Sequence, residues 1–158
     1  MEDKKFYLTK EGLAKIKKEF ESLESIKLSK TRGEGPKILH SEDLDPEYLA
    51  FQEDMSFLES RLGELGYIIK NVELIKTPPK NQQNTVNLGA TVTLEEKGNK
   101  INEFTLVGSL EANPAVGKIS NESPVGKFLL GKKINEEVAI TSPIKVVYKV
   151  KKIKYNLS

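Results

Sequence analysis

The sequence predicts an α+β protein that consists of a long antiparallel α-helical coiled-coil hairpin followed by a compact α+β domain. Two stretches in the first half carry apolar residues at alternating steps of three and four, the pattern of helices that lie along one another. After residue 84 the pattern changes to short apolar runs separated by Gly and Asn, which is typical of strands and turns. The polar, proline-bearing stretch between them predicts a linker at 78–84, with domains at 1–77 and 85–158.

The first helix is predicted over about 10–27. Thr9 is a suitable N-cap, and Glu11 falls in the first turn, where the helix dipole favours a carboxylate. Lys27 occupies the next seam position, and two glycines and a proline follow it, so an irregular connection is predicted at 29–44. The apolar seam of this helix consists of Leu13, Ile16, Phe20 and Leu23.

The second helix is predicted over 46–76. Asp45, Pro46 and Glu47 have the residue types of an N-cap and of the first two helical positions. An unbroken heptad pattern follows, and it predicts packing against the first helix. The apolar seam of the second helix consists of Tyr48, Phe51, Met55, Leu58, Leu62, Leu65, Ile69 and Val72.

The C-terminal half is predicted to contain short strands and one short helix. Ser123 suits an N-cap, Pro124 suits the first helical position, and Gly131 suits the residue beyond the helix end. Gly98 is predicted to lie in a turn. The predicted strand segments are Val86, Leu88, 90–94, 104–107 and 146–150. The lysine-rich end of the chain predicts the solvent face of an edge strand, with Lys149, Lys151, Lys152 and Lys154.

Composition excludes several classes of function. The chain has no Cys and one His, so disulfides, thiolate metal sites and a structural zinc site at His40 are excluded, and His40 is predicted to be an exposed loop residue. The net charge is only +2, so electrostatic binding must come from local patches. No apolar run approaches the length of about 18 residues that a membrane span needs. We therefore expect a cytoplasmic protein with no membrane partner.

Nine short segments, taken in order, carry a family resemblance. They are residues 8–13, 47–48, 57–62, 88–93, 107–108, 111–112, 119–120, 123–127 and 130–133. Together they cover both halves of the chain, and in this order they resemble the GreA/GreB family of bacterial transcript cleavage factors. The resemblance implies an FKBP-like fold for the C-terminal α+β domain.

The resemblance also implies a function and a partner. A protein of this family is a transcription elongation factor that binds bacterial RNA polymerase and inserts its coiled coil into the secondary channel. It stimulates the polymerase's own Mg²⁺-dependent cleavage of backtracked nascent RNA. It is therefore not itself an enzyme, has no cofactor of its own, and is expected to act as a monomer.

An acidic cluster before the second helix is the candidate catalytic tip. The resemblance places Asp43 at the family's first acidic position, as a ligand of an Mg²⁺ ion shared with the polymerase active site. Two residues of the family's tip, including its second acid, are missing here, so Asp45 or Glu42 would have to substitute. Carboxylates suit Mg²⁺, which prefers oxygen ligands. The alternative for Asp45 is that it only caps the second helix.

Four cations lie toward the same tip. In the family a basic patch contacts RNA, and Lys27, Lys30, Arg32 and Lys37 are the candidates for contacts with RNA phosphates or the polymerase. The alternative is that they belong to a solvated loop.

Two other functions stay open on the sequence. The shortened tip is also compatible with a divergent family member that occupies the channel and modulates or inhibits transcription without promoting cleavage. An FKBP-like domain also raises the possibility of a peptidyl-prolyl isomerase with a coiled-coil adaptor. An isomerase pocket is lined by aromatic residues, and those beyond the linker are Phe104, Phe128, Tyr148 and Tyr155.

Overall fold

The computed structural model describes residues 4–32, 46–141 and 145–156. The chain forms two compact units, one of residues Leu13–Asn71 and the other of residues Met1–Gly12 together with Val72–Ser158. The division therefore falls at residue 72 rather than at the predicted linker, and the first twelve residues join the C-terminal unit. The predicted fold class, a helical hairpin followed by an α+β domain, is confirmed.

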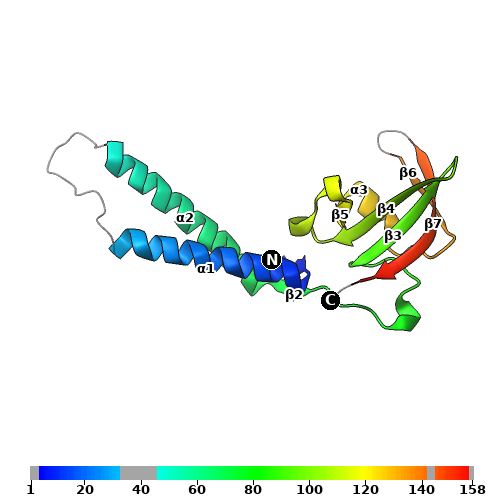
Figure 1. Cartoon of the computed structure of the whole chain (residues 1–158), viewed down its shortest axis with the longest axis horizontal. Helices are drawn as coiled ribbons and strands as arrows, with labels where there is room; N and C mark the ends of the chain where they lie inside the picture. Colours follow the sequence, from blue (N-terminus) through cyan, green and yellow to red (C-terminus); the bar gives the residue numbers. More distant parts are fainter. Residues whose placement is uncertain (1–3, 33–45, 142–144, 157–158) are drawn as a thin grey trace. The chain divides into compact units, whose positions relative to one another are not determined.

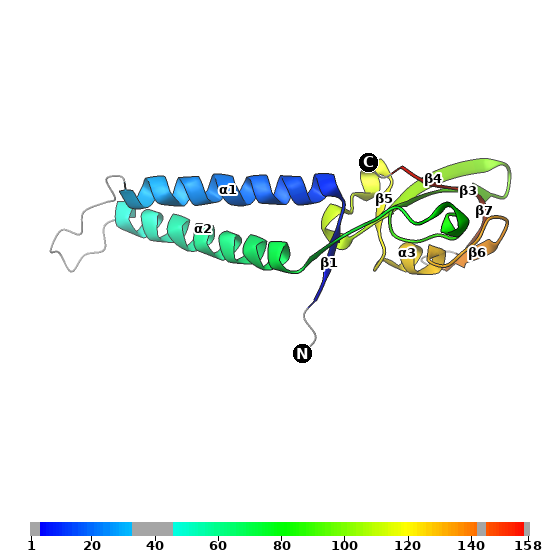
Figure 2. The same cartoon turned by 90° about the horizontal axis from the view of Figure 1, so that it is seen from below.

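The first unit consists of two long helices, α1 (Lys10–Arg32) and α2 (Pro46–Lys70), which lie side by side (Figures 1 and 2). On α2 the seam residues Leu58 and Leu65 are buried, as the heptad pattern predicts. Ile68 is buried as well, although the pattern predicts its neighbour Ile69. On α1 the four predicted seam residues are each partly buried.

Both helices end at other residues than the sequence predicts. α1 continues through Lys27 and ends at Arg32. Lysines occupy the seam positions 27 and 30, and the helix accommodates them because carboxylates of α2 face both side chains. α2 ends at Lys70, where the side chain of Asn71 donates a hydrogen bond to the carbonyl oxygen of Tyr67 at 2.9 Å. The predictions of a helix end near 27, a connection starting at 29 and a second helix reaching 76 are therefore wrong.

Val72 does not belong to the helical seam but begins strand β2 (Val72–Leu74), which pairs in parallel with β1 (Phe6–Leu8). Leu8 is fully buried, and its carbonyl oxygen accepts a hydrogen bond from the amide of Ile75 at 2.9 Å. The short apolar segment at the start of the chain is thus held by a strand that lies more than sixty residues away in sequence.

The C-terminal unit is built on a five-stranded sheet with the order β5-β4-β3-β7-β6, in which only β4 and β5 pair in parallel. Three predicted strand segments are confirmed as parts of β3, β4 and β7. Val86 and Leu88 lie outside the named strands, and Val86 is instead fully buried in the core. The strands are β3 (Ala90–Glu96), β4 (Lys100–Val107), β5 (Lys118–Ser120), β6 (Glu137–Ile140) and β7 (Val146–Tyr155).

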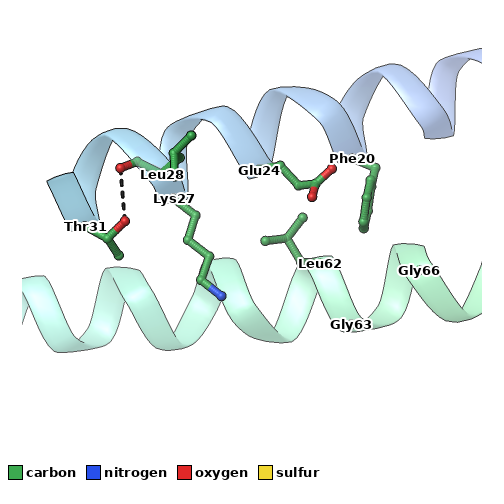
Figure 3. A pocket seen from close by; sticks show the side chains of 8 residues that line it. All are labelled: Phe20, Glu24, Lys27, Leu28, Thr31, Leu62, Gly63 and Gly66. Carbon is green, nitrogen blue, oxygen red and sulfur yellow. Dashed lines mark hydrogen bonds between the residues drawn. The ribbon is translucent and has the colours of Figure 1, made fainter.

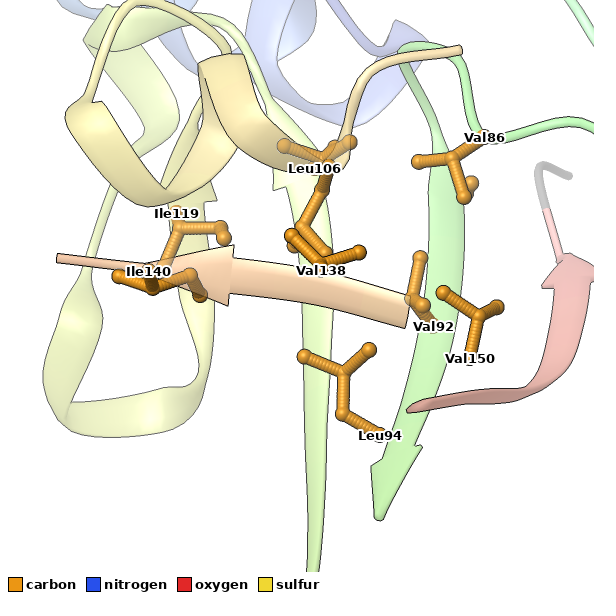
Figure 4. Packing of buried hydrophobic residues seen from close by; sticks show 10 residues of the cluster. Val86, Val92, Leu94, Leu106, Ile119, Val138, Ile140 and Val150 are labelled. Carbon is orange, nitrogen blue, oxygen red and sulfur yellow. The ribbon is translucent and has the colours of Figure 1, made fainter. Parts of the chain in front are cut away.

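The core of this unit gathers on one face of the sheet. Figure 4 shows side chains of β3, β4 and β6 pointing toward one another, with Leu106 and Val138 near the centre. Helix α3 (Pro124–Leu129) contributes Leu129 to the same core. The buried cluster consists of Val86, Ala90, Val92, Leu94, Leu106, Ile119, Leu129, Val138, Ile140 and Val150.

The predicted turn and cap residues of this unit are confirmed. The hydroxyl of Ser123 accepts a hydrogen bond from the amide of Gly126 at 3.1 Å and so caps α3. Gly98, between β3 and β4, has a φ of 96°, and Gly131, after α3, has a φ of 81°. Both values lie in the left-handed region, which glycine adopts without the strain that a Cβ causes.

The lysine-rich strand is not an edge strand. β7 lies between β3 and β6, so the prediction that its lysines mark an edge is wrong. The four lysines are nevertheless exposed, as predicted. Lys151 lies at a register shift between Thr93 and Leu94 on the partner strand, and it pairs with Glu95 at 3.0 Å. The pKa of Lys152 is lowered, mainly because the side chain of the like-charged Lys154 lies beside it.

Candidate functional site

The candidate tip lies between the end of α1 and the start of α2. Glu42, Asp43 and Asp45, together with Lys37 and His40, fall within residues 33–45 and so lie outside the described residues. Glu47 is in the first turn of α2, as predicted. The structure therefore describes the two helices that flank this site, α1 and α2.

Two of the predicted RNA-contacting cations face carboxylates of the opposite helix. Lys30 lies 3.1 Å from Asp54, and Lys27 lies 3.7 Å from Glu59. Their side chains are about one third exposed, at 34% and 39%. Arg32, at the end of α1, is exposed. The three residues belong to a helix, so the alternative that they form a solvated loop is wrong for them.

Such pairs are weak enough to exchange partners. Ion pairs at exposed positions contribute only about 0–1 kcal/mol, because water and salt screen them. A phosphate could therefore replace Asp54 or Glu59 as the partner of the lysine without a large loss of stability. The arrangement presents cations along the distal half of the hairpin.

A stronger connection between the helices lies farther from the tip. Arg61 of α2 donates from Nε and Nη2 to both carboxylate oxygens of Glu19 on α1, at 2.9 and 3.1 Å. Nη1 of Arg61 lies 3.1 Å from Glu64 of the same helix. The hydrogen bond to Glu19 is the main reason that the pKa of Arg61 is raised. This two-point contact fixes the register of the helices, because a planar guanidinium fits a carboxylate in one orientation.

Sequence reasoning gave Arg61 and Glu19 no role. A signal for the pair was nevertheless present, because each residue immediately precedes a predicted seam residue, Leu62 and Phe20. Oppositely charged residues that flank a coiled-coil seam commonly pair across it. The signal was not sufficient to choose this pair among the many charged residues of the two helices.

A groove lies between the helices on one face of the hairpin, with a volume of about 500 Å³. Figure 3 shows the ring of Phe20 and the side chain of Leu62 in the space between α1 and α2, and α2 lacks side chains at Gly63 and Gly66. The lining residues are Phe20, Glu24, Lys27, Leu28, Thr31, Leu62, Gly63 and Gly66. The sequence analysis did not predict this groove.

Three of the four aromatic residues beyond the linker serve as packing residues. Phe104, Tyr148 and Tyr155 pack against the buried core of the sheet. The hydroxyl of Tyr155 also accepts a hydrogen bond from the amide of Asn87 at 2.9 Å and donates one to the carbonyl oxygen of Thr85. These contacts give the three side chains a structural role.

Within residues 4–32, 46–141 and 145–156, no group of three or more His, Cys, Asp or Glu could hold a metal ion. In the same residues, no helix is both long and apolar enough to cross a bilayer.

Comparisons with known proteins cover both units. The family described as "Transcription elongation factor, GreA/GreB, C-term" matches residues 81–155. A protein of Thermomicrobium roseum named Transcription elongation factor GreA is 37% identical over 142 residues, which is 86% of this chain and 88% of that protein. The protein of the same name from Bacillus subtilis is 41% identical over 146 residues, or 90% and 91% of the two chains.

A solved structure, that of GreA factor homolog 1 of Thermus thermophilus, is 24% identical, with coverage of 96% and 99% and a TM-score of 0.43. At that TM-score the likeness supports no conclusion about this chain. The hairpin, the α+β unit and the relatives that match most of the chain define a transcription elongation factor. The chain belongs to the GreA/GreB family.

Proposed function

We propose that this protein binds bacterial RNA polymerase, inserts its hairpin into the secondary channel and stimulates the polymerase's own cleavage of backtracked nascent RNA. The observation that carries the proposal is the match to GreA proteins over about nine tenths of the chain, which includes both the hairpin and the C-terminal unit. A likeness confined to the C-terminal unit would leave the hairpin without a role.

The tip carboxylates are the proposed contribution of this chain to the chemistry. The donor set fits Mg²⁺, because Glu42, Asp43 and Asp45 supply the hard oxygen ligands that this ion prefers. Asp43 would hold the ion, with Asp45 or Glu42 as the second ligand. When bound, a second Mg²⁺ supports phosphodiester hydrolysis by activating water or by stabilising the leaving oxygen. The polymerase supplies the first metal and the RNA.

The two helices of the hairpin would carry these carboxylates. The two-point contact between Arg61 and Glu19 joins the helices, and Lys27 and Lys30 face Glu59 and Asp54 nearer the tip. Together with Arg32 and Lys37, the two lysines would contact RNA phosphates or polymerase carboxylates in the channel. The C-terminal unit would dock on the exterior of the polymerase.

The test uses a stalled elongation complex whose RNA is labelled. Added protein should shorten the RNA from its 3′ end in the presence of Mg²⁺, and polymerase binding should be measured in parallel. Wild-type protein that fails to bind polymerase would rule out the proposal.

A second function is favoured by the shortened tip. The two residues missing relative to the family pattern include its second acid, so the protein could occupy the channel and modulate transcription without promoting cleavage. The same experiment distinguishes the two. Binding accompanied by cleavage supports the first function, and binding that slows RNA synthesis without cleavage supports the second.

A further inference from the structure

The groove between α1 and α2 has apolar walls that remain open to solvent. Phe20 and Leu62 line it from the two helices, and Leu28 beside them is 49% exposed. A groove of about 500 Å³ can receive one or two large side chains of another molecule (Figure 3).

The two glycines in this wall are not required by the chain itself. A Cβ added to Gly63 would meet nothing within 4 Å, and one added to Gly66 would lie 3.7 Å from the Phe20 ring, an ordinary contact. Both residues lie within α2, where glycine is less favourable than alanine. An alanine at either position would therefore fit and favour the helix. Glycines that the fold does not need are explained by a partner that approaches the backbone of α2 closely.

The charges of the groove indicate the chemistry of that partner. Lys27 faces Glu59 at 3.7 Å, so its charge is partly compensated within the chain. Glu24, on the same wall, has no hydrogen-bond or ion-pair partner in residues 4–32, 46–141 and 145–156. A suitable partner segment has an apolar side chain that enters the groove and, next to it, a Lys or Arg that pairs with Glu24.

We propose that this groove is a docking site for such a segment of RNA polymerase, one that carries an apolar side chain next to a basic residue. The proposal rests on the proposed function, because it takes the hairpin to enter the polymerase. It adds a contact along the shaft of the hairpin that is separate from the tip. This contact would contribute to affinity without contributing to chemistry.

The test compares the full-length protein with a Gly63→Ala, Gly66→Ala double variant in equilibrium binding to RNA polymerase. The two added methyl groups should narrow the groove beside the α2 backbone and weaken binding by about tenfold or more, as expected for a change at the centre of an interface. The variant should melt at the same temperature or a few degrees higher, because alanine favours the helix. Ser60→Ala is the matched control, since Ser60 is exposed on α2 and does not line the groove. It should bind like the wild type.

Glu24→Gln provides a second variant that preserves size. It should weaken binding and reduce the salt dependence of affinity, because it removes the charge that faces the partner's cation. A double variant that binds as tightly as the wild type would overturn the docking site and leave the proposed function standing. Wild-type protein that does not bind polymerase would overturn both.

Two further outcomes would also overturn the docking site. If the double variant melts at a lower temperature, the glycines serve the fold itself. If it changes self-association in sedimentation and leaves polymerase binding unchanged, the groove belongs to a second copy of this chain.

Discussion

The carboxylate of Glu111 accepts two hydrogen bonds from Thr9, one from its backbone amide at 2.9 Å and one from its hydroxyl at 2.6 Å. The Thr9 hydroxyl oxygen in turn accepts from the amide of Gly12 at 3.0 Å, which confirms Thr9 as the N-cap of α1. A residue 102 positions away thus supports the first turn of a long helix. A carboxylate near a helix N-terminus is also favoured by the helix dipole.

Replacing Glu111 with alanine should lower the free energy of unfolding by about 1–3 kcal/mol, because both donors of Thr9 lose a charged acceptor. Urea denaturation followed by circular dichroism measures the change. Thr9→Ser is the control, since serine keeps both donors and should stay close to the wild type. An unchanged urea midpoint for Glu111→Ala would show that the contact contributes nothing to stability.

Gly12→Ala should destabilise the protein although alanine favours helices. The added Cβ would collide with the side chain of Glu111, which would have to move away from Thr9. In a Glu111→Ala background the collision disappears, and the same substitution should stabilise α1 by up to about 1 kcal/mol. A double-mutant cycle measures this reversal of sign. Equal effects of Gly12→Ala in the two backgrounds would show that the side chain of Glu111 does not restrict residue 12.

The seam of the hairpin should be most sensitive at Leu65. This side chain is fully buried, so Leu65→Ala should lower the free energy of unfolding by about 2–5 kcal/mol. Leu62 is only partly buried, because it borders the groove, and Leu62→Ala should have a smaller effect. The two variants are compared by chemical denaturation. A larger loss for Leu62 than for Leu65 would show that the seam is assigned wrongly.

Stability should fall at alkaline pH through Tyr155. Burial raises the pKa of its hydroxyl, so the neutral phenol is favoured in the folded protein. The stabilisation is complete below the unfolded pKa of about 10, and it is lost as the pH rises through the folded pKa. Thermal melts between about pH 8 and 11 should show this loss, and Tyr155→Phe should reduce it. If Tyr155→Phe loses as much stability at alkaline pH as the wild type, the effect comes from other groups.

Local patterns in the sequence predicted the helices and the principal strands but not the helix ends. The heptad spacing is repeated many times, so it identifies α1 and α2 despite their charged surfaces. Lys27 and Lys30 occupy seam positions that the pattern reserves for apolar residues, and this led to the short first helix. Their carboxylate partners Glu59 and Asp54 come from α2, which a reading of α1 alone does not consider.

Contacts between segments that are distant in sequence could not be predicted, for a related reason. Glu111 and Thr9, or β1 and β2, carry no periodic signal that links them. The lysine-rich sequence of β7 correctly predicts exposed side chains, but strand order depends on pairing across the sheet. The roles of Asp43 and the other tip residues stay predictions, since those residues lie outside the described part of the chain.

Asp43→Asn should remove stimulated cleavage while polymerase binding remains nearly unchanged. Asparagine preserves the size of the side chain but lacks the charge that attracts Mg²⁺. Asp45→Asn is the matched control, because asparagine caps a helix about as well as aspartate. If Asp45→Asn also abolishes cleavage, Asp45 is a second ligand rather than only a cap. If Asp43→Asn cleaves like the wild type, Asp43 is not a metal ligand.

RNA cleavage in a stalled elongation complex, measured with saturating wild-type protein over a range of Mg²⁺ concentrations, decides whether this protein is a cleavage factor. We expect the labelled RNA to shorten from its 3′ end faster than with polymerase alone, and polymerase then to resume synthesis. Protein that binds the polymerase and leaves the rate of cleavage unchanged at every Mg²⁺ concentration would contradict this expectation.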